Sequence, residues 1–157
     1  MQSRLDYRKA APAALRTMLD METYLASCGL ERSLVLLIKM RASQLNGCAH
    51  CLDMHSKDAR QQGETEQRLY LLSAWRETSL FSARERAALA WTEALTFVAE
   101  TRVPDDVYDV AHAQFSDREL MDLTLAVAAI NSWNRIAIGF RVEAGNYQPL
   151  APLKAHG

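Results

Sequence analysis

The sequence predicts an all-α fold, a single compact bundle of about six or seven helices. Only six Gly and four Pro occur among 157 residues, which leaves little material for turns and favours long helices. Apolar residues recur at helical spacing along most of the chain, and no segment shows the strict alternation of a half-buried strand. Two Ser-x-x-Glu capping boxes mark helix starts. These observations leave no place for a sheet in the predicted fold.

Each predicted helix has its own boundary signals. Pro12 is tolerated in a first helical turn, and Gly29 is the predicted stop of the helix that begins at Pro12. Ser82 and Ser116 each open a capping box. Pro104 begins a helix whose first turn carries two aspartates, where the helix dipole favours negative charge. The predicted helices occupy residues 12–29, 31–46, 47–62, 65–75, 82–98, a segment from 104, and 116–139.

The last predicted helix, residues 116–139, is apolar on nearly all sides. A helix without a polar face lies at the centre of a fold or at a subunit interface. The chain also has three tryptophans, and its apolar surface exceeds what one small core easily covers. We therefore expect a homo-oligomer. Residues 1–10 and 146–157, the latter with Pro149 and Pro152, are expected to be peripheral arms.

The charge balance excludes several classes of protein. Eighteen Lys and Arg against nineteen Asp and Glu give a formal charge of −1, so no basic excess attracts phosphate backbones, and we expect no nucleic-acid partner. No apolar run approaches the ~20 residues that cross a bilayer, and no secretory signal is recognisable. We therefore expect no membrane association and a cytoplasmic location, where thiols stay reduced.

Residues 46–55 carry the most distinctive motif of the chain, Cys48-x-x-Cys51-x-x-x-His55. On a helix that turns by about 100° per residue, these three side chains share one face. Residues three apart bring their Cβ atoms to roughly 5–6 Å, so a modest adjustment permits a disulfide. His55 lies one turn after Cys51, within reach of a hydrogen bond to its sulfur. His50 points away from this face.

Gly47 allows a sharp helix entry that places both cysteines in the first turn. Free backbone N–H groups and the helix dipole stabilise a thiolate there. Thiols of Cys-x-x-Cys motifs have pKa values of about 3.5–7.5 instead of ~8.5. A thiolate beside a second cysteine is the arrangement that attacks a peroxide or a disulfide, and the neighbouring thiol then resolves the product. The motif therefore favours redox chemistry.

Two other interpretations of the motif stay open. Cys48, Cys51 and His55 supply three metal ligands, but a structural zinc site needs a fourth. Cys28 and His112 are candidates for it, and neither has a paired spacing. Alternatively, the thiols are buried and inert. We predict that the protein holds no metal and no cofactor, and that the lone Cys28 is an ordinary packing residue.

The stretch from Arg41 to His55 resembles the core signature of the alkyl hydroperoxidase D and carboxymuconolactone decarboxylase-like superfamily. Residues 131–135, Asn-Ser-Trp-Asn-Arg, are similar to the corresponding long helix of small members. The likeness covers about residues 30–141 of one domain, 1–157. It implies an all-helical fold that assembles into trimers or hexamers. It also implies a peroxidase or disulfide-reductase activity that uses the cysteine pair.

The resemblance implies a role for each residue of the motif. Cys51 attacks the peroxide and forms the sulfenate, Cys48 closes the disulfide, and His55 is the relay histidine. His50 matches a histidine between the two cysteines. The partners are a peroxide substrate and an external thiol or dithiol that restores the pair. The residue spacing also favours Cys51 as the attacking cysteine, since its sulfur lies one turn from His55.

One position departs from the pattern of the family. The hydroperoxidase motif has a glutamate twelve residues before the first cysteine, and Leu36 stands there in this chain. Gln44 lies on the Cys48 face, but an amide takes no proton. Glu93, on an otherwise apolar helix, is the candidate for a relocated carboxylate. The interpretation that we favour for Glu93 is nevertheless a half-exposed helical glutamate, because unpaired Glu is rarely buried.

The sequence thus predicts a thiol-dependent peroxidase that works through a Cys48–Cys51 redox disulfide. One alternative is a redox-sensing or metal-binding oligomeric module. Another is an enzyme of the decarboxylase branch that uses His55 as a base. Lactone decarboxylation needs no redox cysteine pair, so the motif favours thiol chemistry.

Overall fold

Helices account for all the regular secondary structure of residues 2–149, the part of the chain that the computed structural model describes. The all-α prediction is therefore confirmed. None of these helices is long and apolar enough to cross a membrane. The elements are α1 (Tyr7–Ala10), α2 (Pro12–Leu25), α3 (Arg32–Asn46), α4 (Ala49–Gln61), α5 (Glu66–Leu71), the 3₁₀ helix η1 (Leu72–Glu77), α6 (Ala83–Thr96), α7 (Val98–Thr101), α8 (Asp105–His112) and α9 (Asp117–Phe140).

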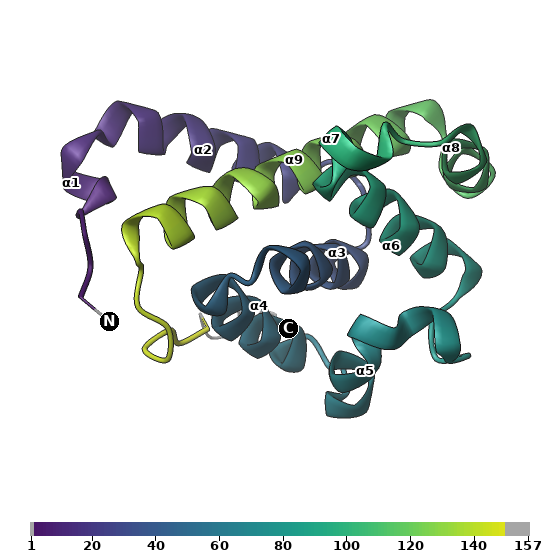
Figure 1. The fold of residues 1–157 in the computed structure, drawn as a ribbon, viewed down its shortest axis with the longest axis horizontal. Helices are drawn as coiled ribbons and strands as arrows, with labels where there is room; N and C mark the ends of the chain where they lie inside the picture. Colours follow the sequence, from purple (N-terminus) through teal and green to yellow (C-terminus); the bar gives the residue numbers. More distant parts are fainter. Residues whose placement is uncertain (1, 150–157) are drawn as a thin grey trace, which may run out of the picture.

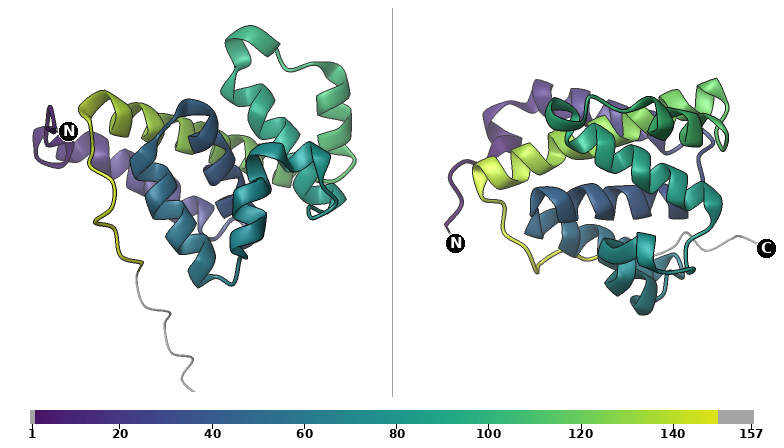
Figure 2. Two further views of the ribbon diagram at one scale, coloured as in Figure 1. Left: turned by 60° about the horizontal axis from the view of Figure 1, so that its bottom comes forward. Right: turned by 45° about the vertical axis from the view of Figure 1, so that its right-hand side comes forward.

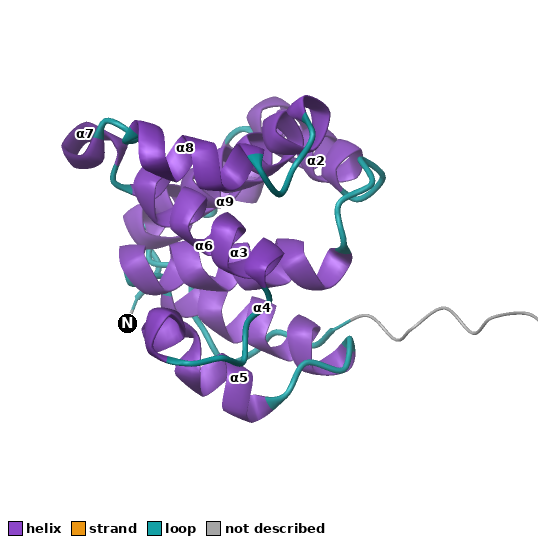
Figure 3. Cartoon of the chain, turned by 90° about the vertical axis from the view of Figure 1, so that its right-hand side faces the viewer, coloured by secondary structure: helices purple, strands orange, loops and turns teal. Residues whose placement is uncertain are grey.

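Helix α3 lies at the centre of the bundle. It contacts α4, α6, α9 and η1. In Figure 1, α2 and α9 run along one side of α3 and α4 lies along the other, and the two views of Figure 2 show the same order. Figure 3 shows from a third direction that α4 and α5 lie on the side of α3 opposite α2. The burial of α3 therefore determines where the cysteine motif at its end is placed.

The core consists of apolar clusters on both sides of α3. Leu34 and Ile38 pack into a cluster that draws on α2, α6, α8 and α9. Leu37 and Met40 pack into a second cluster with side chains of α4, α5, η1 and α6. Two different faces of α3 thus bury apolar side chains, which explains why its run of apolar residues lacks a polar face.

The predicted boundaries of the longer helices hold to within a few residues, except that α2 ends at Leu25, four residues before Gly29. Pro12 occupies the first turn of α2. Ser82 and Ser116 form complete capping boxes with the glutamates three residues on, and these begin α6 and α9. Gly47 ends α3 in a left-handed conformation, with φ 70° and ψ 34°. Local side-chain chemistry therefore determines these helix ends before tertiary packing acts on them.

The structure differs from the prediction in three short regions of the chain. The single helix expected over residues 65–75 is two elements, α5 and η1, and the backbone leaves helical geometry at Ala74. Two helices of four residues, α1 and α7, were not predicted. Asp6 accepts hydrogen bonds from two backbone N–H groups of α1, and Arg102 ends α7 in a left-handed conformation. One-turn helices of this kind carry no periodic apolar pattern.

A cluster of buried amides joins α3 to α9 just before the cysteine motif. Asn46 donates hydrogen bonds to the side-chain oxygens of Asn131 and Asn134, at 3.0 and 2.9 Å. Asn134 in turn donates to Ser43 at 3.0 Å, and Asn131 donates to Thr96 at 3.1 Å. Because buried polar groups need their partners, this cluster fixes the register between the two helices.

The described parts of both predicted arms, residues 2–10 and 146–149, include contacts with the bundle. The backbone N–H of Arg4 donates to the carbonyl of Phe140 at 3.0 Å, which holds the N-terminal segment at the end of α9. After α9 the chain returns along α4, as the yellow segment of Figure 1 shows. We refer to residues 143–147 as the C-terminal strap. Pro149 is the last residue described, and Pro152 lies outside the described residues.

Candidate active site

The redox motif begins α4, as the sequence predicts. The turn at Gly47 places Cys48 at the N-cap of the helix and Cys51 in its first turn. The backbone N–H of Cys51 donates to Cys48 Sγ at 3.4 Å. Both sulfurs therefore lie at the positive end of the helix dipole, where a thiolate is stabilised.

The two cysteines are joined by a disulfide, and their Cα atoms lie 5.4 Å apart. Each residue is only 1% exposed. Cys48 packs in a small apolar cluster with Ala42 and Ile130. Cys51 lines a cavity that Cys48 does not reach. An incoming molecule in this cavity therefore meets the sulfur of Cys51 first.

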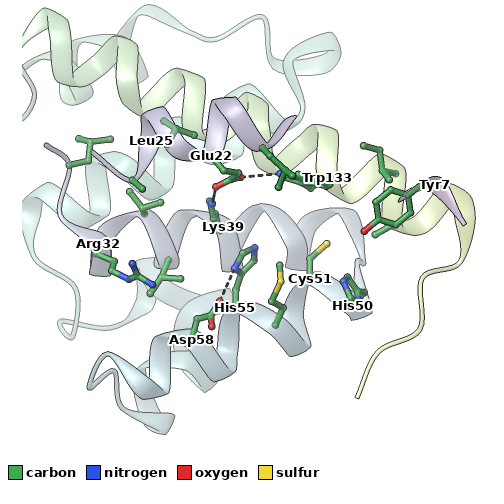
Figure 4. Close-up of a pocket in the computed structure, with 18 of the residues that line it drawn as sticks. Tyr7, Glu22, Leu25, Arg32, Lys39, His50, Cys51, His55, Asp58 and Trp133 are labelled. Carbon is green, nitrogen blue, oxygen red and sulfur yellow. Dashed lines mark hydrogen bonds and ion pairs between the residues drawn. The ribbon is translucent and has the colours of Figure 1, made fainter. Parts of the chain in front are cut away.

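The cavity has a volume of about 430 Å³ and lies between α2, α3, α4 and α9 (Figure 4). Its apolar wall includes Val35, Leu36, Met54 and Ile136. Leu36 thus lines the cavity at the α3 position where the family motif has a glutamate. The volume admits an organic molecule of moderate size beside Cys51.

His55 lines the same cavity and is 6% exposed. Its Nδ1 is buried without a hydrogen-bond partner, and the nearest carboxylate oxygen, Oδ2 of Asp58, is 3.9 Å away. Within residues 2–149 no hydrogen bond joins His55 to either sulfur. Burial, followed by the nearby Lys39 and His50, lowers the pKa of His55 from 6.5 to about 3, so the ring is neutral at pH 7.

A buried ion pair that the sequence did not reveal also lines the cavity. Lys39 of α3 is 7% exposed, and its Nζ donates to Oε2 of Glu22, on α2, at 2.5 Å. The other oxygen of Glu22 accepts a hydrogen bond from Nε1 of Trp133 at 3.0 Å. Figure 4 shows this trio on the side of the cavity opposite Asp58. The only sequence signal was a lysine inside an apolar helical run.

His50 is half-buried and lies at the edge of the cavity, although helical geometry placed it away from the Cys48 face. Its Nδ1 lies 2.8 Å from the carbonyl oxygen of Glu143 in the C-terminal strap. His50 therefore joins the redox helix to the strap, and Figure 4 shows it beside Cys51.

The structure does not bring Glu93 to the cavity. Its carboxylate accepts hydrogen bonds from Arg41 at 2.7 Å, from Trp75 at 2.8 Å and from Arg76. Burial raises the pKa of Glu93, but the three hydrogen bonds outweigh it and lower the pKa below its usual value. Glu93 is therefore a fixed anion in an ion-pair cluster between α3, η1 and α6. It does not reach the cavity as a relocated relay carboxylate. It is the partly exposed helical glutamate that we favoured, with its side chain 16% exposed, and the structure adds its three partners.

The two candidates for a fourth metal ligand lie elsewhere. Cys28 donates to the carbonyl of Leu25 at 3.3 Å and packs against the main core, as predicted for a packing residue. His112 pairs with Asp117 at 2.9 Å and stacks on Tyr108. In residues 2–149 no group of three or more His, Cys, Asp or Glu side chains is arranged to hold a metal ion.

Acid is expected to destabilise the protein through His55. Between pH 6.5 and about pH 3 the unfolded chain binds a proton that the folded chain does not, so the free energy of unfolding falls as the pH is lowered. The step from pH 7 to pH 5 is expected to remove about 2 kcal/mol. Urea unfolding at the two pH values measures the loss. A His55→Gln variant should lack this contribution, and an equal loss in both proteins would contradict the prediction.

An all-helical bundle with a cysteine pair at the start of an inner helix, facing a cavity beside a histidine, defines the alkyl hydroperoxidase D-like class of proteins. The chain belongs to the carboxymuconolactone decarboxylase family, whose model matches residues 12–94. This membership confirms the resemblance stated from the motif.

Relatives and solved structures agree with this assignment. The uncharacterized protein YdfG of Bacillus subtilis is 45% identical over 146 residues, covering 93% of this chain and 99% of the relative. A crystal structure from Agrobacterium tumefaciens, described as a protein of unknown function and putative antioxidant defence protein AhpD, has a TM-score of 0.90 and 46% identity, covering 93% of this chain and 100% of that one. An uncharacterized peroxidase-related protein from Ralstonia eutropha has a TM-score of 0.77 at 17% identity, covering 88% and 74% of the two chains, a likeness of fold alone.

Proposed function

We propose that the protein is a thiol-dependent peroxidase that reduces hydrogen peroxide or organic hydroperoxides through Cys48 and Cys51. The observation that carries the proposal is the placement of the cysteine pair at the N-terminus of α4, where Cys51 lines the cavity and Cys48 does not. The apolar wall of the cavity suits the body of an organic hydroperoxide.

The proposed reaction has two steps on the protein. The thiolate of Cys51 attacks one peroxide oxygen, the O–O bond breaks, and Cys51 becomes a sulfenic acid while the leaving alkoxide takes a proton. The thiol of Cys48 then attacks the sulfur of Cys51, the S–S bond forms, and water leaves. An external thiol or dithiol returns two electrons and two protons to the disulfide by thiol–disulfide exchange.

The alternative use of His55 as the base of a decarboxylase has less support. A histidine base by itself does not explain why two cysteines should share the start of α4.

A homo-oligomer, a trimer or hexamer, is part of this proposal. Two apolar side chains of α9, Met121 and Ile138, are 62% and 45% exposed. Subunit contacts commonly cover exposed apolar surface of this kind. The proposal also places the protein in a reducing compartment such as the cytoplasm, where thiol reductants are available.

A thiol count tests the proposed chemistry. One equivalent of cumene hydroperoxide, added to the fully reduced protein, is expected to lower the number of thiols that react under denaturing conditions from three to one. The remaining thiol should be Cys28, and peptide mass spectrometry should find the Cys48–Cys51 disulfide. Cys28→Ser is the control, and it should lose both of its thiols. If the protein loses thiols no faster with cumene hydroperoxide than in buffer alone, the proposal is contradicted.

A further inference from the structure

The Nδ1 nitrogen of His55 lacks the partner that a buried imidazole needs. A neutral imidazole carries one ring hydrogen, and a buried ring nitrogen without a partner is costly. Nδ1 is buried and has no hydrogen bond. In other proteins a catalytic histidine is held in one tautomer by an acceptor on its second nitrogen. The question is which group of this chain can be that acceptor.

The cavity holds two carboxylates, and only one of them is available. Both oxygens of Glu22 accept hydrogen bonds, one from Lys39 and one from Trp133. Asp58 uses only Oδ1, which accepts from the hydroxyl of Tyr147 at 2.8 Å. Its Oδ2 faces Nδ1 of His55 at 3.9 Å, and Figure 4 shows the two side chains pointing toward each other from one face of α4.

We propose that Asp58 is the positioning residue for His55 in the reduced protein. Its Oδ2 accepts the hydrogen bond of Nδ1–H, which leaves the lone pair of Nε2 to take the proton of the Cys51 thiol. Closing 3.9 Å to hydrogen-bond distance needs a shift of about 1 Å, and such contacts often tighten only in the reacting complex. The proton passes from Cys51 to His55 and then to the leaving alkoxide, so the inference rests on the proposed function.

The C-terminal strap supports Asp58 from outside the helix. The N–H of Gly145 donates to Asp53 at 2.9 Å, and Lys57 Nζ donates to the carbonyl of Tyr147 at 2.9 Å. The strap therefore fixes the Tyr147 ring against α4. Burial, together with the hydrogen bond to Asp58, raises the pKa of Tyr147 to about 12. Tyr147 thus stays protonated and keeps donating to Asp58, which leaves Oδ2 free for His55.

The charges around His55 explain how the carboxylate of Asp58 can influence its protonation. Lys39 on α3 and His50 on α4 disfavour a charged His55, and Asp58 is the anion placed to oppose them. Other charged or titratable side chains that line the cavity are Tyr7, Arg8, Glu22 and Arg32. A carboxylate within about 4–6 Å typically changes the pKa of a neighbouring group by one unit or more.

The test is the pH dependence of Cys51 alkylation in the reduced protein, followed by peptide mass spectrometry with iodoacetamide as the probe. Asp58→Asn is expected to slow alkylation at pH 7 about tenfold and to move the profile toward higher pH. Asp58→Glu should restore most of the rate. Tyr147→Phe should give a smaller loss, because Asp58 keeps its charge but loses its fixed orientation.

Asp117→Asn is the matched control. It removes a carboxylate that pairs with a histidine, His112, at 2.9 Å, but neither residue lines the cavity or contacts the strap. Its profile should match that of the unmodified protein. The proposal is overturned if the Asp58→Asn profile matches that of the unmodified protein too, or if Asp117→Asn shifts as much as Asp58→Asn. Because alkylation needs no peroxide, a shifted profile without peroxide turnover would refute the proposed function and leave the role of Asp58 intact.

Discussion

Peroxide reduction driven by a dithiol is expected to fall by a factor on the order of 10³ or more in Cys51→Ser. Cys51 is the sulfur that lines the cavity, at the first turn of α4, where a thiolate is stabilised. A serine hydroxyl at this position stays protonated and forms no sulfenate. The measurement is steady-state consumption of cumene hydroperoxide with dithiothreitol as the electron donor.

Two further cysteine variants separate the roles of the sulfurs. Cys48→Ser should react once with peroxide and then stop at the sulfenic acid, which dimedone labels, because no resolving thiol remains. Cys28→Ser should turn over like the unmodified protein, since Cys28 packs away from the cavity. A Cys51→Ser rate within twofold of the unmodified protein would contradict the peroxidase proposal, and a dimedone label on Cys48 in Cys51→Ser would reverse the two roles.

The buried ion pair leads to the second large effect. Glu22→Leu leaves Lys39 at 7% exposure without its partner, and the free energy of unfolding is expected to fall by about 3 kcal/mol. The loss arises because Nζ must remain charged in a poorly hydrated site or lose its proton. Urea unfolding at pH 7 measures it.

A double variant and a surface variant provide the controls. Glu22→Leu combined with Lys39→Met removes both charges and should recover most of the lost stability. Glu31→Leu breaks an ion pair with Arg84 in which Glu31 is half-exposed, so it should cost only about 0–1 kcal/mol. Equal losses of unfolding free energy for Glu22→Leu and Glu31→Leu would contradict the prediction that the buried pair contributes more to stability than the exposed one.

The fold was predictable wherever local chemistry determines it. Ser82 and Ser116 signal helix starts through contacts three residues away, and Gly47 marks the turn before the redox helix. The kink at Ala74 was not predictable, because it depends on how η1 packs against the bundle. The sequence carries the helical period but not the places where tertiary contact interrupts it.

The candidate site divides in the same way. The spacing along one helix was sufficient to place Cys48 beside Cys51 and to place Cys51 and His55 on the same cavity, but the hydrogen bond expected between His55 and the sulfur of Cys51 is not formed. The ion pairs of Glu93 were missed, because the cations that bind it come from α3 and η1, far along the chain. The pairing of Glu22 with Lys39 was missed for the same reason. Contacts between distant segments have no signature in the spacing of a single sequence.

The amide cluster between α3 and α9 limits which parts of the protein need to move in the proposed redox cycle. Asn46 donates to two asparagines of α9 immediately before the turn at Gly47, so the backbone that carries Cys48 is anchored at its start. Under the proposed function, opening and closing the disulfide is then expected to involve rotations about the side-chain bonds of Cys48 and Cys51. Loop and domain motions, which take up to milliseconds, are not expected to limit each cycle.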